Sequence, residues 1–559
     1  MPDRPTIDPP THLRDRIRGF FSREPTVGVT LAILALAIVA RILGGYYLFF
    51  WEEDEGSLAN GVAALVRDSI GGGLYRYGPQ LGYYRFIEFV DRLLGGDLAR
   101  VPGIMTTVSA VAGAVIPVAA LFLLRDALSP RVRWLLAGLV MINPAIWKAS
   151  QYGNTAMLQT ALATVSLVVL SNRPGRWGQL AALALFGAAT LVRADGVLLA
   201  PVLCWMLWRN TPDGLANAVR TAAVFAVIMA AVYALLFLFD PRMDDIAAEV
   251  AEHVLNDRYP TMFWEYLLWS VSPFVLGFAV LGMAELLVDR RALAITVAVW
   301  CLPVFAFYYG STTTTRYFLL VAVPLSLCAA VGIEQLAHRL TAAGTRFAWP
   351  ALLALASVHL FVGLGHFTPA RITNPLRAPN FRTHDGYMPT GALLYDAYYL
   401  WGGGLFGQSF RNAGFGKTYT FHHDELLASL RADARAGRTA VVLLDGGFGH
   451  AFHFFALRDG ATYVSRKPGM YFHTETWLLI GEMRVMTISY RSSYFEDLQR
   501  FDVRAGDLVY ISDDLDPEFP GPEVLGKLPG GLTLVADDRS RESTFWRYTV
   551  APRTDDIAN

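Results

Sequence analysis

Four consecutive carboxylates, Glu52–Glu55, follow directly on the first long apolar segment of the chain, residues 27–50. Apolar residues flank them on both sides, and Leu58, Val62 and Leu65 have helical spacing. Charges held against an apolar surface cost free energy unless a cation, a metal ion or a proton-transfer role compensates them. A solvated charge run that merely ends a helix is the plainer alternative. The spacing favours an amphipathic helix on the membrane surface, with the carboxylates at its positive end.

The rest of this loop, to residue 101, has the residue types of a surface-lying structure. Glycine and proline at 78–79 indicate a turn, and the aromatic residues that follow to Phe86 are typical of a helix at the membrane interface. We expect Tyr83 and Tyr84 to line a cavity above the membrane; a place in an aromatic belt with no direct role is the alternative. Further candidates for this cavity, or for a plain interfacial cap, open a later apolar segment: Gln151, Tyr152 and Asn154.

The composition places these residues in a membrane protein. Hydrophobic residues make up 54% of the 559-residue chain and charged residues 17%, against about 25% charge in soluble domains. These figures exclude disorder, nucleic-acid binding and a collagen-like fibre. A membrane span needs about 20 mostly apolar residues. Eleven candidate segments precede residue 366: 27–50, 102–124, 133–149, 155–171, 178–192, 195–208, 219–239, 270–288, 292–309, 317–337 and 348–365.

The distribution of basic residues predicts the orientation of these spans. With the N-terminus in the cytoplasm, the inside loops carry 16 basic residues in 65 positions and the outside loops carry 10 in 100. This difference agrees with the positive-inside rule. The first apolar run is too long for a signal-peptide core, so we interpret it as a retained anchor. We therefore predict a multi-pass protein of the plasma (inner) membrane whose loop at 51–101 and C-terminus are extracytoplasmic.

The long apolar runs stop at about His366. Strand-like runs follow at 439–445, 476–480, 507–512 and 532–535, with helical patterns at 424–436 and 493–501. This alternation favours a small α/β domain. The predicted divisions are a cytoplasmic tail at 1–26, a helical membrane domain at 27–365 and an extracytoplasmic α/β domain at 366–559. Two histidine-bearing segments, 422–425 and 449–453, lack the spacing of a metal site, and we interpret the first as a helix start.

Several of these features together resemble the GT-C glycosyltransferases, in the branch of protein mannosyltransferases and lipid A aminoarabinose transferases. An acidic pair, Asp54-Glu55, ends the first span, and a long loop with two interfacial helices follows. The Pro-Pro-Leu-x-Tyr element of many members is reduced to Pro79-Gln80-Leu81-Gly82-Tyr83. The segments 150–154 and 193–196 also fit. The likeness covers about residues 25–365 and implies a GT-C-like helical fold and transfer of a hexose or pentose from a polyprenyl-phosphate-linked donor.

The predicted location supports the same donor independently. Nucleotide sugars and ATP are cytoplasmic, so an outward-facing transferase needs a donor that has already been carried across on a lipid. Because phosphate is a good leaving group, one carboxylate suffices as general base on the acceptor hydroxyl, and direct displacement inverts the anomeric carbon. The resemblance implies Asp54 as this base, with Glu53 and Glu55 as alternatives or as ligands of sugar hydroxyls. Metal use varies within this superfamily, so a divalent cation is compatible with the resemblance but has no assigned residues.

The donor phosphate requires fixed cations near the outer face. Arginine binds phosphate oxygens bidentately, and lysine serves as a point charge. Arg193 lies between two short apolar segments, where a charge is costly and indicates function; snorkelling to the interface is the alternative. Arg316 closes a polar turn that leads into a span, so we expect it at the same cavity. Lys148 and Arg258 are further candidates on the outside.

The acceptor and the competing functions are less constrained. A cell-envelope glycan, a lipid or a protein would each serve as acceptor, and the sequence does not set the oligomeric state. A secondary transporter or flippase is the main alternative function. Such proteins often show internal symmetry and charges near mid-bilayer, whereas this sequence shows no internal repeat and its charges gather at one outer loop. A sensor or scaffold that works through its soluble domain would leave the acidic first loop unexplained.

Overall fold

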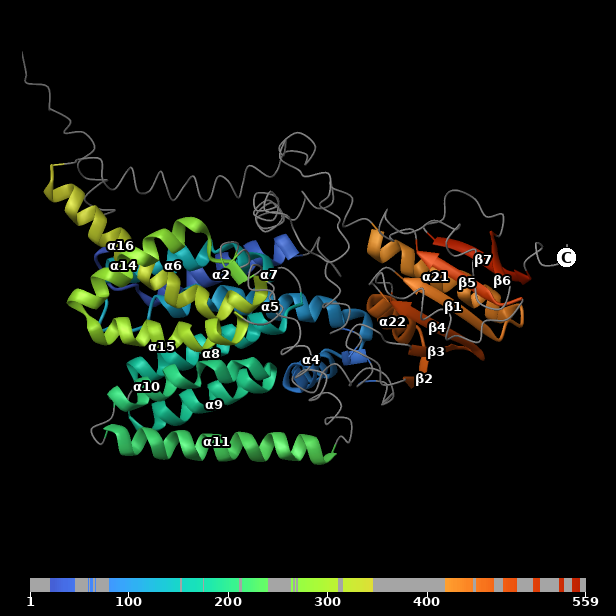
Figure 1. Ribbon diagram of the computed structural model, residues 1–559, viewed down its shortest axis with the longest axis horizontal. Helices are drawn as coiled ribbons and strands as arrows, with labels where there is room; N and C mark the ends of the chain where they lie inside the picture. The colour runs from blue at the N-terminus through green and yellow to red at the C-terminus, as the bar shows by residue number, and fades with distance from the viewer. Residues whose placement is uncertain are drawn as a thin grey trace, which may run out of the picture.

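The structure is a computed structural model with a helical bundle and a mixed sheet beside it (Figure 1). The description covers residues 21–45, 59, 61–63, 66, 80–150, 153–173, 175–210, 214–239, 263–264, 267, 270–309, 315–344, 418–445, 449–466, 476–489, 506–512, 532–536 and 545–552.

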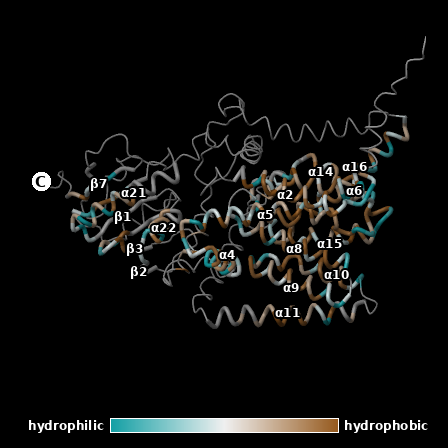
Figure 2. Tube along the Cα trace, turned by 180° about the vertical axis from the view of Figure 1, so that it is seen from behind, coloured by the Kyte–Doolittle hydropathy of each residue, from teal (hydrophilic) through white to brown (hydrophobic). Residues whose placement is uncertain are grey.

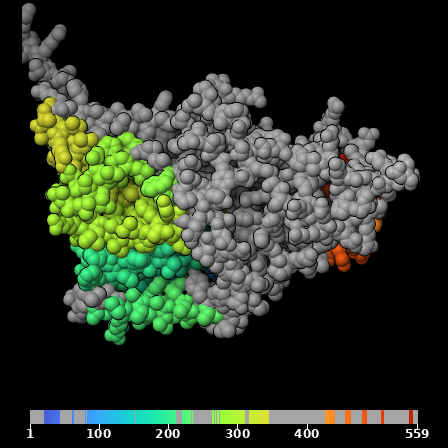
Figure 3. Space-filling view, viewed as in Figure 1, coloured from blue at the N-terminus to red at the C-terminus, as the bar shows by residue number. Residues whose placement is uncertain are grey.

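Apolar helices form the bundle, as the hydropathy colouring shows (Figure 2). Their bounds are α2 Val27–Gly45, α5 Val101–Ala120, α6 Pro130–Met141, α7 Pro144–Ala149, α8 Thr155–Asn172, α9 Arg176–Val192, α10 Ala200–Asn210, α11 Gly214–Phe239, α14 Pro273–Asp289, α15 Arg291–Tyr308 and α16 Leu319–Ala342. Among the described residues, four stretches are long and apolar enough to cross a membrane: Leu98–Ala120, Thr155–Asn172, Arg291–Tyr308 and Arg316–Ala342. In the space-filling view, α14 and α15 form the near face of the bundle above α11 (Figure 3).

Most of the predicted spans coincide with these helices. The coinciding segments are 27–50, 102–124, 155–171, 178–192, 219–239, 270–288, 292–309 and 317–337. The segment 348–365 lies outside the described residues.

Two predicted spans differ in their backbone. The segment 133–149 is broken into α6 and α7 between Met141 and Pro144. Proline disfavours helical backbone in the residue before it, and the Asn143 side chain instead accepts a hydrogen bond from the Ile146 amide at 3.0 Å. The segment 195–208 begins as a 3₁₀ turn, η4 Ala194–Leu199, before it continues as α10.

Glycines bring two helices into backbone contact. A Cβ atom on Gly282 of α14 would lie 1.8 Å from the carbonyl oxygen of Cys328 in α16. A Cβ on Gly332 of α16 would lie 2.4 Å from the carbonyl oxygen of Phe278 in α14. Small residues permit such close packing between membrane helices. The pair α14–α16 is therefore a tightly fixed part of the bundle.

The first long loop contributes an amphipathic helix, α4 Leu81–Leu93. Tyr83, Tyr84 and Ile87 are fully buried on one side. Large apolar side chains are exposed on the other side: Phe86, Phe89, Leu93 and Leu94. An exposed apolar stripe of this kind suits a helix that lies at the membrane interface, as the aromatic pattern predicts.

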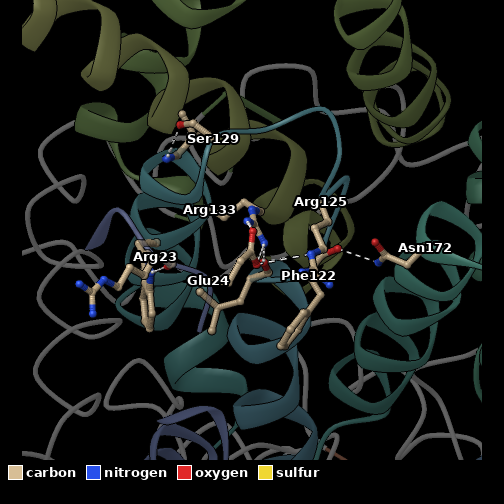
Figure 4. A network of polar contacts seen from close by, with 10 residues as sticks. Arg23, Glu24, Phe122, Arg125, Ser129, Arg133 and Asn172 are labelled. Atoms are coloured by element: carbon tan, nitrogen blue, oxygen red, sulfur yellow. Dashed lines mark hydrogen bonds and ion pairs between the residues drawn. The ribbon is translucent and has the colours of Figure 1, made fainter. Parts of the chain in front are cut away.

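The end of the bundle where α2 begins is held by ion pairs (Figure 4). Arg133, whose side chain is 1% exposed, donates to both carboxylate oxygens of Glu24 and to the carbonyl oxygen of Leu121. Arg125 adds a second cation to Glu24, at 3.4 Å. Asn172, the last residue of α8, donates to the carbonyl oxygen of Phe122 at 2.7 Å. The opposite end of α8, which begins at Thr155, therefore lies at the other end of the bundle.

Residues after 418 form a seven-stranded sheet in the order β2-β3-β4-β1-β5-β7-β6. Its central strand β1 is parallel to β4 and β5, whereas the other neighbours are antiparallel. The strands are β1 Ala440–Asp445, β2 Thr462–Arg466, β3 Thr476–Ile480, β4 Met483–Ser489, β5 Leu508–Ser512, β6 Leu532–Ala536 and β7 Phe545–Pro552. Helix α21 Thr418–Arg435 contacts β3, and α22 Gly449–Arg458 contacts β4.

The predicted runs in this region match β1, β3, β5 and β6, and the predicted helix at 424–436 matches most of α21. The helix start predicted at 422–425 is wrong, because α21 begins at Thr418. The acidic residues at 424–425 therefore lie inside the helix, just after its first turn. The helical pattern at 493–501 lies outside the described residues.

One cluster of buried hydrophobic residues links the loop helix with the sheet region. It contains Tyr83, Tyr84 and Ile87 of α4, the start of α5, and Val192 at the end of α9. It also contains residues of α21, α22 and the strands, among them Leu427 and Phe455. The apolar surface of the C-terminal region is therefore buried together with that of the first loop.

Candidate active site

Arg193 occupies the break between α9 and η4. Helix α9 ends at Val192, and the backbone of Arg193 turns to an extended conformation, with φ −160° and ψ 125°. Its Nε donates to the carboxylate of Asp195 at 2.9 Å, and the two side chains are 12% and 13% exposed. The predicted functional arginine is thus held by an acid two residues further on.

Asp195 receives hydrogen bonds from two other helices. The Gln159 side-chain amide of α8 donates to one carboxylate oxygen at 2.5 Å, and the Tyr308 hydroxyl of α15 donates to the other. With Arg193, both oxygens are engaged by donors. A carboxylate whose two oxygens are engaged in this way is a counter-ion that orients its arginine.

Tyr317 joins the second predicted arginine to the first. It belongs to the 3₁₀ turn η5 Thr315–Phe318, and its ring stacks on that of Tyr308 with centroids 4.6 Å apart and an interplanar angle of 6°. The guanidinium carbon of Arg193 lies 4.9 Å from the Tyr317 ring centroid, and that of Arg316 lies 5.4 Å from it. The structure therefore brings Arg193 and Arg316 together on one ring, as the sequence predicts.

The charges of this cluster favour an anion. Two guanidinium groups and one carboxylate leave a net positive charge in a largely buried place. Within the described part of the chain, only Nε of Arg193 has a hydrogen-bond partner, so its two terminal amino groups remain for a ligand. Two parallel N–H groups match the oxygens of a phosphate. The arrangement suits an anion such as phosphate, at the end of the bundle opposite Glu24.

Helix α4 packs next to this cluster. A Cβ on Gly82 would lie 2.5 Å from the carbonyl oxygen of Leu191, so the start of α4 touches the last turn of α9. Tyr83 and Tyr84 follow directly, fully buried, with ring centroids 6.2 Å apart in an edge-to-face arrangement. Both tyrosines lie beside the Arg193 segment rather than in an exposed aromatic belt.

Asn154 lies at the start of α8, in the same region. Its side-chain oxygen accepts a hydrogen bond from the Ala156 amide at 2.8 Å and caps the helix, and the residue is 4% exposed. Its backbone amide donates to Ser109 of α5 at 2.9 Å. Asn154 thereby fixes the helix from which Gln159 reaches Asp195.

Lys148 is placed by its backbone only. It belongs to α7, and α7 contacts η5, which carries Arg316. The other predicted site residues lie outside the described residues: Glu53, Asp54, Glu55, Gln151, Tyr152 and Arg258. In the ranges described above, no group of three His, Cys, Asp or Glu residues could hold a metal ion.

Sequence reasoning missed four residues of this cluster: Gln159, Asp195, Tyr308 and Tyr317. Asp195 is part of the segment 193–196 that the resemblance already singled out, and its spacing from Arg193 was the available signal. Gln159 is a polar residue inside an apolar span, which indicates function by default. The two tyrosines could not be identified, because their role depends on contacts between α15, η5 and η4.

The helical bundle and the attached sheet are similar in fold to ArnT from Cupriavidus metallidurans. Its structure bound to undecaprenyl phosphate has a TM-score of 0.59 and 14% identity, over 94% of this chain and 98% of that one. Its apo structure has a TM-score of 0.56 and 14% identity, over 93% of this chain and 97% of that one. No family model matches the sequence, and no curated protein matches it.

Proposed function

We propose that the chain is an inverting glycosyltransferase that moves a sugar from a polyprenyl-phosphate carrier to an acceptor on the extracytoplasmic side of the plasma membrane. The observation that carries the proposal is the pair Arg193 and Arg316 on Tyr317, with the terminal amino groups of Arg193 free among the described residues. A lipid-borne phosphate supplies the anion that this site favours. The polyprenyl chain remains in the bilayer beside the apolar helices.

The fold supports the same class of donor. The similar ArnT structure was solved with undecaprenyl phosphate. In this chain, Arg193 and Arg316 would bind the phosphate and stabilise the negative charge that grows on it as the glycosidic bond breaks. Lys148 and Arg258 are the further cations we assign to this phosphate. Tyr83, Tyr84, Gln151, Tyr152 and Asn154 belong to the walls of the same cavity.

The general base is assigned to Asp54 of the first loop. It removes the proton from the acceptor hydroxyl, whose oxygen then attacks the anomeric carbon from the side opposite the phosphate. Glu53 and Glu55 are the alternatives for this role or bind sugar hydroxyls. Asp195 is the acid nearest the arginines, but its three donors keep it as their counter-ion. Base and phosphate site therefore come from different parts of the chain.

The proposal includes the topology that the basic residues predict. Eleven spans place the N-terminal tail 1–26 in the cytoplasm, and the loop at 51–101 and the α/β domain at 366–559 outside. The acceptor is a cell-envelope glycan, lipid or protein. The burial of α21 and α22 residues in one cluster with α4 supports a C-terminal domain that closes over the donor site.

The test uses the purified full-length protein in lipid nanodiscs with a panel of polyprenyl-phospho-sugars. Release of polyprenyl phosphate is measured. We expect turnover with at least one donor and a loss of about 10²–10⁴-fold in kcat for Asp54→Asn, with donor affinity kept, because a general base contributes that factor. Asp126→Asn, an exposed acid between α5 and α6, is the matched control. Normal turnover by Asp54→Asn removes it as the base, and flux of the substrate across vesicles without bond cleavage would favour a transporter.

A further inference from the structure

The side chain of Gln159 forms the link between α8 and the Arg193 segment. It is completely buried in an apolar helix that qualifies as a membrane span. Its Nε2 donates both to the backbone carbonyl oxygen of Arg193, at 3.1 Å, and to the Asp195 carboxylate, at 2.5 Å. Because both partners are acceptors, they determine which end of the amide is the nitrogen. The contact therefore engages the backbone and the counter-ion of Arg193 at once.

We infer that Gln159 is a positioning residue for the donor phosphate: its amide holds the break between α9 and η4 so that the terminal amino groups of Arg193 face the ligand. This inference rests on the proposed donor site. Gln159 itself does not touch the phosphate. Its effect passes through the Arg193 backbone and through Asp195, which fixes Nε of the guanidinium.

Thr160 and Thr164, the two threonines that follow Gln159 in α8, do not make such a link. Thr160 and Thr164 donate to carbonyl oxygens one turn back in their own helix, Ala156 and Thr160, each at 2.7 Å. These bonds satisfy the hydroxyls within α8. Gln159 instead gives both of its N–H groups to another element. The amide oxygen of Gln159 is buried without a partner among the described residues, so this amide is costly in an apolar helix, and the use of its nitrogen across helices indicates a specific role.

Gly196 supplies the space that the Gln159 amide requires. A Cβ at residue 196 would lie 3.1 Å from Nε2 of Gln159, and 3.3 Å and 3.4 Å from the backbone of Thr190. The backbone of Thr190 cannot give way without moving α9. The substitution Gly196→Ala would therefore displace the Gln159 amide, which gives a second and independent way to disturb its hydrogen bonds to Arg193 and Asp195.

The experiment measures the binding of undecaprenyl phosphate to the full-length protein in nanodiscs, with the uncharged undecaprenol as a parallel ligand. We expect Gln159→Met, which keeps the length but removes both hydrogen bonds, to weaken phosphate-lipid binding about tenfold. Binding of undecaprenol should stay within twofold. Gln179→Met on α9, near the end of the bundle that holds Glu24, is the matched control and should bind both lipids like the wild type.

Gly196→Ala is the second variant, because it leaves every polar group in place. We expect a smaller, severalfold loss for the phosphate lipid and none for undecaprenol. In turnover with a cleavable donor, both variants should raise the donor KM by more than they lower kcat. Gln159→Asn keeps the amide on a shorter side chain, so we expect it to bind the phosphate lipid better than Gln159→Met but less well than the wild type.

Equal weakening for both lipids would mean general damage to the bundle and would overturn the inference. So would normal phosphate-lipid binding by Gln159→Met. The binding assay needs no catalysis, so its result is separable from the proposed function. If the variants weaken phosphate-lipid binding but no donor is ever cleaved, the glycosyltransferase proposal fails while the positioning role stands.

Discussion

The two ends of the helical bundle use arginine in opposite ways. At the end shown in Figure 4, Glu24 lies between Arg133 and Arg125, and Arg133 also bonds the Leu121 carbonyl oxygen. At the other end, Arg193 bonds its counter-ion through Nε only, and Arg316 lies across the Tyr317 ring. Both terminal amino groups of Arg133 donate to the protein itself, whereas those of Arg193 have no partner among the described residues. Arg133 and Arg193 are thus distinguished by the partners of their hydrogen bonds rather than by burial, since both are largely buried.

Removing Arg193 should give the largest effect on ligand binding. We expect Arg193→Ala to raise the donor KM by at least about 100-fold, because two charged hydrogen bonds of about 1.5–3 kcal/mol each are lost. The measurement is steady-state turnover with a polyprenyl-phospho-sugar. Arg193→Lys should retain part of the affinity, since the charge remains but the bidentate geometry does not. A wild-type donor KM for Arg193→Ala would show that Arg193, like Arg133, does not bind the donor.

Removing Glu24 should affect stability and leave donor binding unchanged. Glu24→Gln leaves the buried Arg133 without its counter-charge, so we expect a loss of about 1–3 kcal/mol in the free energy of unfolding. Thermal unfolding in nanodiscs measures it, together with the donor KM. Glu285→Gln is the control, because Glu285 pairs with Arg339, whose side chain is 68% exposed, and an exposed pair contributes less than about 1 kcal/mol. A change in donor KM for Glu24→Gln would contradict a purely structural role.

The smallest expected effect is on the pH dependence of the free energy of unfolding, to which Glu24 and Asp91 should contribute with opposite signs. The hydrogen bond from Arg133 lowers the pKa of Glu24 below its ordinary value of 4.5. Its stabilisation is therefore present above that value and is lost as the pH falls through the lowered pKa. Burial, followed by the nearby charge of Asp97, raises the pKa of Asp91 in α4. Its ionised form therefore opposes folding as the pH rises through the raised pKa.

The variants Glu24→Gln and Asp91→Asn separate these contributions. Asp91 is fully buried, and within the described ranges neither carboxylate oxygen accepts a hydrogen bond. Asp91→Asn should stabilise the protein by about 1 kcal/mol at neutral pH, whereas Glu24→Gln should destabilise it there and flatten the acid limb. Unfolding temperatures between pH 4 and pH 8 provide the comparison. Loss of stability in Asp91→Asn would show that the carboxylate has a partner it needs.

The apolar segments and the two arginines could be read from the sequence because each depends on local composition. Length and hydropathy identify a membrane helix, and a charge at the end of a span is conspicuous against it. The break before Pro144 was readable in principle, since proline and the preceding Asn143 are ordinary signals of a helix boundary. It was missed because the hydrophobic run continues through it.

The contacts that define the site could not be read in the same way. Tyr308 and Asp195 are 113 positions apart, and their hydrogen bond exists only because the end of α15 lies against the start of η4. The same limit applies to the sheet, where β4 pairs in parallel with β1 across an intervening helix and two strands. Local patterns predict elements, whereas the partners of elements depend on the packing of the whole chain.

The backbone contact between α14 and α16 gives the two cations different mechanical support. Arg316 lies just before α16, which is in backbone contact with α14 at Gly282 and Gly332. Arg193 stands on an interruption that is tied across the bundle by side-chain hydrogen bonds from Gln159 and Tyr308. Arg316 therefore precedes a helix fixed by backbone contact, whereas the position of Arg193 depends on side-chain hydrogen bonds from two other helices.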